Sequence, residues 1–173
     1  IVDPVMISKH GARLLSPEAQ TVLKTRLLPS ATLVTPNIPE AEALTGMEIR
    51  SEADMEQAAR RLCDLGCGAA VVKGGHRDGP PVDIFFDGRA MERFPGTRVE
   101  TRHTHGTGCA FSAAITAAVA LRLPLLHAVH LAKQFVQDGL ENAPGLGHGH
   151  GPLNHFGQAG RALGLLMRER YHR

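Results

Sequence analysis

The sequence predicts an α/β fold with a mainly parallel central sheet flanked by helices. Short apolar segments alternate along the chain with stretches of helical periodicity, which is the order typical of α/β proteins. The apolar segments do not alternate with polar residues, and this suits strands that are covered on both faces. Glycine and proline stand between the segments as helix and strand ends. We therefore expect a single α/β domain over residues 1–173.

The expected strands are short and apolar. The dipeptide Asp87-Gly88 lies between two of them and is a strong signal for a hairpin. The first expected strand ends at Asp3-Pro4, and the second is closed by Pro36. Strands are expected over Ile1–Val5, Ala31–Thr35, Ala69–Lys73, Val82–Phe86 and Ala90–Phe94.

The expected helices carry recognisable ends. Ser16-Pro17 places an N-cap residue before a proline at the first helical position, and Pro29 stops that helix. Ser51 can cap a helix whose first turn is acidic. Helices are expected over Ser16–Leu28, Pro39–Leu44, Ser51–Leu65, Gly106–Leu121, Leu125–Asn142 and Gln158–His172.

Composition excludes several classes of protein. A formal net charge of +2 is too small to indicate a nucleic-acid or membrane partner, and 4% aromatic residues argue against a base-stacking surface. The count of 3 cysteines predicts no disulfide framework and favours a reducing cytoplasm. The longest apolar run, Ala110–Leu121, is too short to span a bilayer. Because the chain starts within an apolar run at Ile1, we expect a fragment or a processed chain.

The most distinctive local pattern is Gly106-Thr107-Gly108-Cys109 at the start of a helix. Glycines allow a tight turn and close backbone approach, and the first free N–H groups of the helix form an anion site. A developing charge on a transferring phosphoryl group could be stabilised there. The helix dipole also favours the thiolate of Cys109, which could accept a proton from a hydroxyl group. A glycine-started helix with a small packed cysteine explains the pattern equally well.

Three other motifs follow expected strands. Asn37 and Glu40 could place an amide and a carboxylate beside Mg²⁺ and ATP phosphates, although Asn-x-x-Glu is also a capping-box pattern, which is the favoured reading in isolation. Lys73, before two glycines, could reach phosphate oxygens, and Asp3 could supply a second carboxylate. Each alone is better explained as a strand end or a turn.

Together these motifs make the parts of a phosphoryl-transfer site. Each falls where a strand gives way to a loop or helix, which is where ligands bind in open α/β sheets. The set contains acids, an amide, a lysine and an anion hole. Other candidates are weaker: Cys63 and Cys67 are better explained as small packed residues than as zinc ligands, and the histidines of the 143–154 loop and its end lack fixed geometry for a metal.

The ordered set of motifs resembles the hydroxymethylpyrimidine/phosphomethylpyrimidine kinases of thiamine biosynthesis. The resemblance covers about residues 1–156 and is specific only in combination. The matching segments are Val2-Asp3-Pro4-Val5-Met6, Thr35-Pro36-Asn37-Ile38-Pro39-Glu40-Ala41, Val72-Lys73-Gly74-Gly75-His76, His105-Gly106-Thr107-Gly108-Cys109, Ala132-Lys133 and Gly151-Pro152-Leu153-Asn154-His155.

The resemblance implies a ribokinase-like fold and two successive phosphorylations by ATP with Mg²⁺. The substrates would be 4-amino-5-hydroxymethyl-2-methylpyrimidine and its monophosphate. Cys109 matches the family's catalytic base. The remaining matches are Gly106, Thr107 and Gly108 to its anion hole, Lys73 and Asn37 to its ATP-phosphate contacts, Asp3 and Glu40 to its acids near Mg²⁺, and Val5 to its pyrimidine pocket.

The chain departs from the family in lacking the N-terminal strands that supply much of the pyrimidine pocket. We therefore expect this fragment alone to be weakly active or inactive. A homodimer is the expected assembly, because relatives are often dimers. A pyridoxal kinase of the same fold and a non-catalytic nucleotide- or pyrimidine-binding module remain alternatives.

Overall fold

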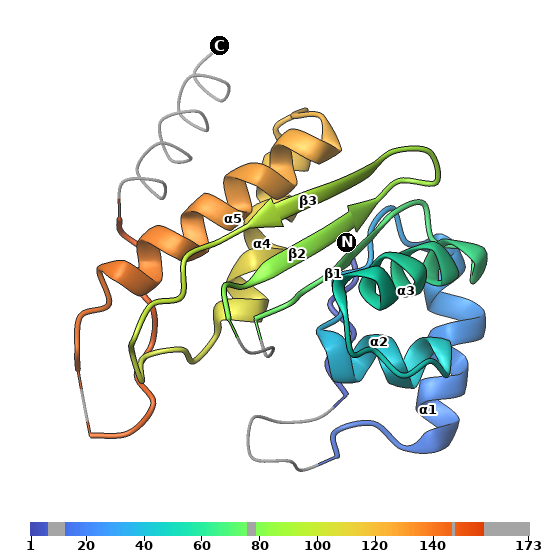
Figure 1. The fold of residues 1–173 in the computed structure, drawn as a ribbon, viewed down its shortest axis with the longest axis horizontal. Coiled ribbons are helices and arrows are strands. Elements are labelled where there is room, and N and C mark those ends of the chain that lie inside the picture. The colour runs from blue at the N-terminus through green and yellow to red at the C-terminus, as the bar shows by residue number, and fades with distance from the viewer. Residues whose placement is uncertain (7–12, 76–78, 147, 158–173) are drawn as a thin grey trace. The chain divides into compact units, whose positions relative to one another are not determined.

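The computed structural model describes residues 1–6, 13–75, 79–146 and 148–157. The chain divides into two compact units, Ile1–Gly96 and Thr97–Arg173, each of which is described by itself. The helix predicted over Gln158–His172 and the residue His76 lie outside the described residues. Figure 1 labels the helices and strands in chain order.

The first helical segment is broken where the sequence predicted one helix. It comprises α1 (Pro17–Val22), a π-helical turn (Leu23–Leu27) and a 3₁₀ turn (Leu28–Ser30). Ser16 caps α1 as predicted. The hydroxyl groups of Thr21 and Thr25 donate to the carbonyl oxygens of Pro17 and Thr21, at 3.0 and 2.8 Å. Such back-bonding bends a helix, and its regular hydrogen bonding is lost one turn later.

Two helices of the first unit begin with capping boxes. The two helices are α2 (Ile38–Thr45) and α3 (Glu52–Asp64). In each, the N-cap side chain accepts a hydrogen bond from the backbone N–H of the third helical residue, and the carboxylate of that third residue accepts one from the N-cap backbone N–H. Gly46 ends α2 with a φ of 72°, a conformation that favours glycine. The apolar face of α3 is buried and packs against the sheet (Figure 1); it consists of Met55, Ala58, Ala59 and Leu62.

The sheet of the first unit is antiparallel, in the order β1 (Ala70–Val72), β2 (Val82–Phe86) and β3 (Met91–Pro95). The predicted hairpin is confirmed. The Asp87 carboxylate accepts from the N–H groups of Arg89 and Ala90 at 2.9 and 2.7 Å, and so holds the turn. The mainly parallel sheet expected from the sequence is not what these strands form.

Parallel pairing is present in the first unit only as isolated bridges within the described residues. The bridges join Val2 to Val34, Val34 to Ala70 and Asn37 to Lys73. The strands predicted over Ile1–Val5 and Ala31–Thr35 are therefore shortened to single bridges, because prolines follow at positions 4 and 36 and cannot donate to a ladder. These three parallel segments nevertheless end side by side, and this brings the residues that follow them together.

The second unit contains α4 (Thr107–Ala120) and α5 (Leu125–Glu141), which pack against each other. Both helices agree with the predicted ranges to within one residue. Gly139 of α5 lies so close to Leu153 that an added Cβ would be 2.7 Å from the leucine Cδ1 atom. None of the helices in the described part of the chain is long and apolar enough to cross a membrane.

Candidate functional site

An ion pair joins the first and third parallel segments of the first unit. The Lys73 ammonium group lies 3.2 Å from Asp3 Oδ1, and each side chain is only 16% exposed. The hydroxyl group of Thr35, on the segment between them, lies 3.5 Å from the same oxygen. Partial burial strengthens this pair relative to a surface salt bridge, because water screens it less. The sequence prediction that Asp3 and Lys73 belong to one site is consistent with this contact.

Asn37 and Glu40 are held together at the start of α2. The Asn37 N–H donates to Glu40 Oε2 at 2.8 Å, and the Glu40 N–H donates to Asn37 Oδ1 at 2.9 Å. The capping-box interpretation of this motif is therefore confirmed. The same geometry fixes a carboxylate beside the Asp3–Lys73 pair, since both charges act on the ionisation of Glu40. The capping role and a role in ligand binding are compatible.

Burial raises the pKa of the Glu40 carboxyl group above its ordinary value. The residue is only 4% exposed. Hydrogen bonds from the backbone N–H groups of Asn37 and Met6 and the positive charge of Lys73 oppose this shift, while the negative charge of Asp3 adds to it. A carboxylate in this position gains from a nearby cation, because a second positive charge would stabilise its ionised form.

The raised pKa of Glu40 predicts a pH-dependent difference between the wild type and Glu40→Gln. The folded protein keeps the Glu40 proton at pH values where the unfolded chain has released it. This stabilisation is complete below the ordinary pKa of 4.5 and is lost as the pH rises through the raised folded value. The wild type should therefore lose stability relative to Glu40→Gln across that window. Urea unfolding of both proteins between about pH 4 and pH 8 measures the difference.

The control for this comparison is Glu92→Gln, which neutralises an exposed carboxylate on β3. Its stability difference from the wild type should change little over the same range. Parallel pH curves for the wild type and Glu40→Gln would contradict the assignment of a raised pKa to Glu40.

The turn after Lys73 is packed directly against β2. The Gly74 N–H donates to Asp83 Oδ1 at 2.9 Å, and a Cβ atom at Gly74 would overlap the Val82 carbonyl oxygen. At Gly75 a Cβ atom would meet nothing within 4 Å. Only the first glycine of the pair is therefore required by packing.

Gly74→Ala is expected to destabilise the protein by about 1–3 kcal/mol, because the added methyl group must displace the backbone of β2. Gly75→Ala is the matched control, and it should change the free energy of unfolding by less than about 1 kcal/mol. Urea unfolding of both variants measures the difference. Equal stabilities would show that the turn can relax at no cost.

The helix α4 begins at the glycine-rich segment where the sequence predicts a helix start. Gly106 is the N-cap residue with a φ of 81°, and no side chain caps the helix there. The Thr107 hydroxyl group donates backward to the Thr104 carbonyl oxygen at 3.2 Å. Cys109, in the first turn, is exposed and free. The alternative of a cysteine packed into the core is therefore wrong.

The remaining residues singled out in the sequence are Val5, Cys63 and Cys67. Val5 is 38% exposed and is not part of the packed core. Cys63 and Cys67 interact with each other. Cys67 is buried and Cys63 is half-buried, which agrees with the prediction that they are small packed residues. The described residues contain no group of three or more His, Cys, Asp or Glu side chains placed to hold a metal ion.

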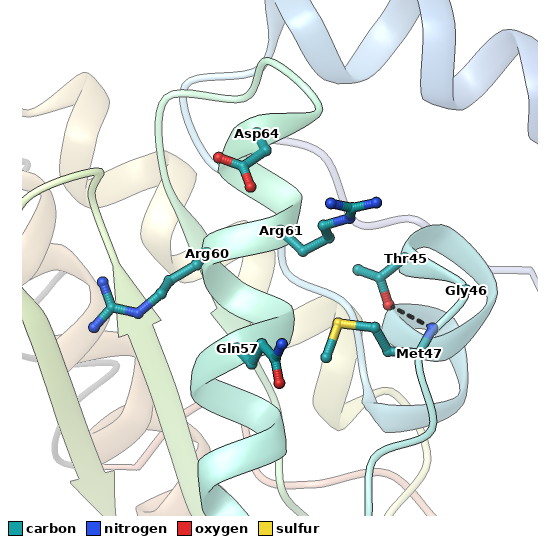
Figure 2. A pocket seen from close by; sticks show the side chains of 7 residues that line it. All are labelled: Thr45, Gly46, Met47, Gln57, Arg60, Arg61 and Asp64. Atoms are coloured by element: carbon teal, nitrogen blue, oxygen red, sulfur yellow. Dashed lines mark hydrogen bonds between the residues drawn. The ribbon is translucent and has the colours of Figure 1, made fainter.

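A cavity of about 440 Å³ lies in the first unit between the end of α2 and α3 (Figure 2). Its walls are Thr45–Met47 on one side and Gln57, Arg60, Arg61 and Asp64 on the other. Arg60 is stacked over the Phe86 ring at 4.8 Å. None of the predicted site residues lines this cavity. Its arginines lie near the C-terminal end of α3, where the helix dipole favours positive charge without any ligand. The cavity is therefore not assigned to the candidate site.

Sequence reasoning missed two residues that the structure adds to the site. Asp83 was predicted only as part of a strand, yet it is 6% exposed and holds the Gly74 amide. A carboxylate within the apolar run Val82–Phe86 is the signal that could have identified it, because buried charges require specific partners. Thr35 is the second residue, because its hydroxyl group lies 3.5 Å from Asp3 Oδ1.

Comparisons with a protein family and with individual relatives both point to the same group of kinases. The family described as phosphomethylpyrimidine kinase matches residues 1–154. The chain is 46% identical over 158 residues to the hydroxymethylpyrimidine/phosphomethylpyrimidine kinase of Bacillus subtilis, covering 90% of this chain and 58% of that protein. It is 51% identical over 157 residues to the thiamine biosynthesis bifunctional protein ThiED of Geobacter sulfurreducens, covering 90% of this chain and 32% of that protein.

Solved structures of related kinases share the fold. The pyridoxal kinase of Staphylococcus aureus in complex with AMP-PCP matches with a TM-score of 0.82 and 33% identity, over 90% of this chain and 57% of that one. The phosphomethylpyrimidine kinase of Clostridium difficile matches with a TM-score of 0.67 and 40% identity, over 78% and 54%. The α/β fold is thus that of ribokinase-like kinases, and the chain belongs to the phosphomethylpyrimidine kinase family.

Proposed function

We propose that the full-length protein transfers the γ-phosphoryl group of ATP to 4-amino-5-hydroxymethyl-2-methylpyrimidine and then to its monophosphate. The chain spans 58% of the Bacillus subtilis relative, so the activity of the whole protein is an inference from this part. The observation that carries the proposal is the Asp3–Lys73 ion pair beside the buried Glu40 carboxylate. It occurs in a chain whose relatives are named as kinases of this substrate.

The chain's own residues provide the functions that phosphoryl transfer needs. Lys73 supplies a positive charge for phosphate oxygens, and a parallel β-bridge places Asn37 on the neighbouring segment, opposite Lys73. The backbone N–H groups of Gly106, Thr107 and Gly108 stabilise negative charge on the moving phosphoryl group. The Cys109 thiolate accepts the proton of the substrate hydroxyl group as its oxygen bonds to phosphorus and the bond to ADP breaks. Val5 is proposed to line the pyrimidine pocket.

Asp3 and Glu40 are proposed to bind Mg²⁺. The residues fit this ion, because Mg²⁺ is usually held by one or two carboxylates together with substrate phosphates and water. The described contacts of the Asp3 carboxylate use Oδ1, and Oδ2 is proposed as the metal ligand. When bound, the ion neutralises charge on the phosphates. A divalent cation would also offset the cost of ionising the buried Glu40.

Further features of the whole protein are proposed with this function. The short parallel bridges of the first unit support a mainly parallel central sheet in the full-length kinase. We further propose one α/β domain over residues 1–173, a homodimer and a cytoplasmic location. Light scattering after size-exclusion chromatography tests the dimer, and a clean monomer would contradict it.

The proposed activity is tested with the full-length protein, ATP and Mg²⁺ on a substrate panel. The panel contains 4-amino-5-hydroxymethyl-2-methylpyrimidine, its monophosphate and pyridoxal, and mass spectrometry identifies the products. Addition of one and then a second phosphoryl group to the pyrimidine is expected. Absence of any phosphorylated product, with ATP binding retained, would support the non-catalytic module. This chain alone is expected to show weak turnover or none.

Pyridoxal kinase is the second candidate function, and a specific observation favours it. The pyridoxal kinases of Staphylococcus aureus match with TM-scores of 0.79 to 0.82, higher than the 0.67 of the phosphomethylpyrimidine kinase of Clostridium difficile. Sequence identity favours the pyrimidine kinases, at 40% against 33% and 34% for the same structures. Formation of pyridoxal phosphate at a kcat/KM equal to or above that for the pyrimidine would reverse the assignment.

A further inference from the structure

A buried carboxylate on β2 has no role in the reaction described above. Asp83 is 6% exposed, within a strand whose neighbouring side chains Ile84, Phe85 and Phe86 are apolar and buried. Burying an ionised carboxylate is costly unless hydrogen bonds compensate for lost hydration. Its Oδ1 atom accepts from the Gly74 N–H at 2.9 Å. This hydrogen bond ties the carboxylate to the residue that follows Lys73.

This hydrogen bond occurs where the pairing of β1 with β2 stops. The register pairs Val72 with Ile84, so that the next position would bring Lys73 opposite Asp83. The Lys73 N–H continues the parallel pairing on the other side of the segment by donating to the Pro36 carbonyl oxygen at 2.8 Å, and the Gly74 N–H donates to the side chain of Asp83. A side-chain acceptor thus replaces a backbone partner, and the chain can leave the strand without an unsatisfied amide.

The backbone of Lys73 is consequently fixed from both sides. The Lys73 N–H donates to the Pro36 carbonyl oxygen, and the N–H of the next residue, Gly74, donates to Asp83 Oδ1. The Gly74 backbone also lies so close to β2 that an added Cβ atom would overlap the Val82 carbonyl oxygen. A lysine side chain carries several rotatable bonds, so a fixed backbone reduces the freedom that must be lost when its ammonium group meets Asp3 or a phosphate.

We propose that Asp83 is a positioning residue for Lys73: it fixes the turn at Gly74 and thereby places the Lys73 ammonium group for the nucleotide. The proposal rests on the proposed kinase function, in which Lys73 meets ATP phosphates. Asp83 acts on ATP only through Lys73. Its effect on nucleotide affinity must therefore disappear when the ammonium group is absent.

The test is a double-mutant cycle in the full-length protein, with the Kd for ATP as its readout. Asp83→Ala is expected to weaken ATP binding about 10-fold. Asp83→Asn keeps an acceptor oxygen for the Gly74 N–H, and it should stay within about 3-fold of the wild type. In a Lys73→Met background, Asp83→Ala should change the Kd by less than about 2-fold.

Several outcomes would overturn the proposal. An equal effect of Asp83→Ala with and without Lys73 would show that Asp83 acts by another route, and an unchanged Kd would show that it does not act at all. Asp83→Ser, a smaller polar variant, replaces Asp83→Ala if the latter does not fold. Unfolding of both variants would assign Asp83 to folding and would also overturn the proposal. A wild type that binds ATP without phosphorylating the pyrimidine would refute only the proposed function.

Discussion

Replacement of Cys109 by alanine in the full-length protein is expected to lower kcat by about 10²- to 10⁴-fold, the usual contribution of a general base. The thiol is exposed in the first turn of α4, next to backbone N–H groups that no side chain caps. Alanine removes the proton acceptor and leaves those N–H groups in place. The Kd for ATP should consequently stay within about 2-fold of the wild type. Steady-state kinetics and calorimetry measure the two quantities.

Cys63→Ala is the matched control for loss of a thiol. Cys63 is half-buried at the end of α3, and its sulfur lies 3.8 Å from the Phe86 carbonyl oxygen. Its removal should leave kcat within about 2-fold of the wild type. A Cys109→Ala protein that keeps full turnover would eliminate Cys109 as the base, and the α4 N-terminus would then serve only to bind an anion.

The secondary structure was largely predictable where local signals determine it. Ser51, Asn37 and Gly46 mark helix ends by capping chemistry that depends only on neighbouring residues. The Asp87-Gly88 hairpin is equally local. The break after Val22 was not predicted, because it depends on hydroxyl groups that back-bond to carbonyl oxygens within a favourable helical sequence.

Strand direction was less predictable, since it depends on partners far away in the sequence. The segment Ala70–Val72 pairs in parallel with Val34 and antiparallel with β2, and its apolar sequence is compatible with both. The site residues divide in the same way, into those with a local sequence signal and those whose role depends on a distant contact. Asp3 and Lys73 were identified by their motifs, whereas the role of Asp83 depends on a contact with Gly74 that the strand pattern does not reveal.

Lys73→Met is expected to lower kcat/KM for ATP about 100-fold, because the ammonium group contributes charge to phosphate binding that a thioether cannot replace. The same change leaves the mostly buried Asp3 carboxylate without its cation, which should cost about 1–3 kcal/mol of stability. It also removes the charge that lowers the pKa of Glu40, so this pKa should rise further. ATP-dependent kinetics and urea unfolding measure both effects.

The double variant Asp3→Asn/Lys73→Met separates the structural effect of Lys73 from the functional one. Neutralising Asp3 removes the unpaired buried charge, and stability should return to within about 1 kcal/mol of the wild type. The kcat/KM for ATP should stay low, because the ammonium group that meets the phosphates and the proposed Mg²⁺ ligand Asp3 are both absent. Recovery of kcat/KM together with stability would show that Lys73 serves only to neutralise Asp3. Lys24→Met, which removes an ammonium group elsewhere in the first unit, should change neither quantity.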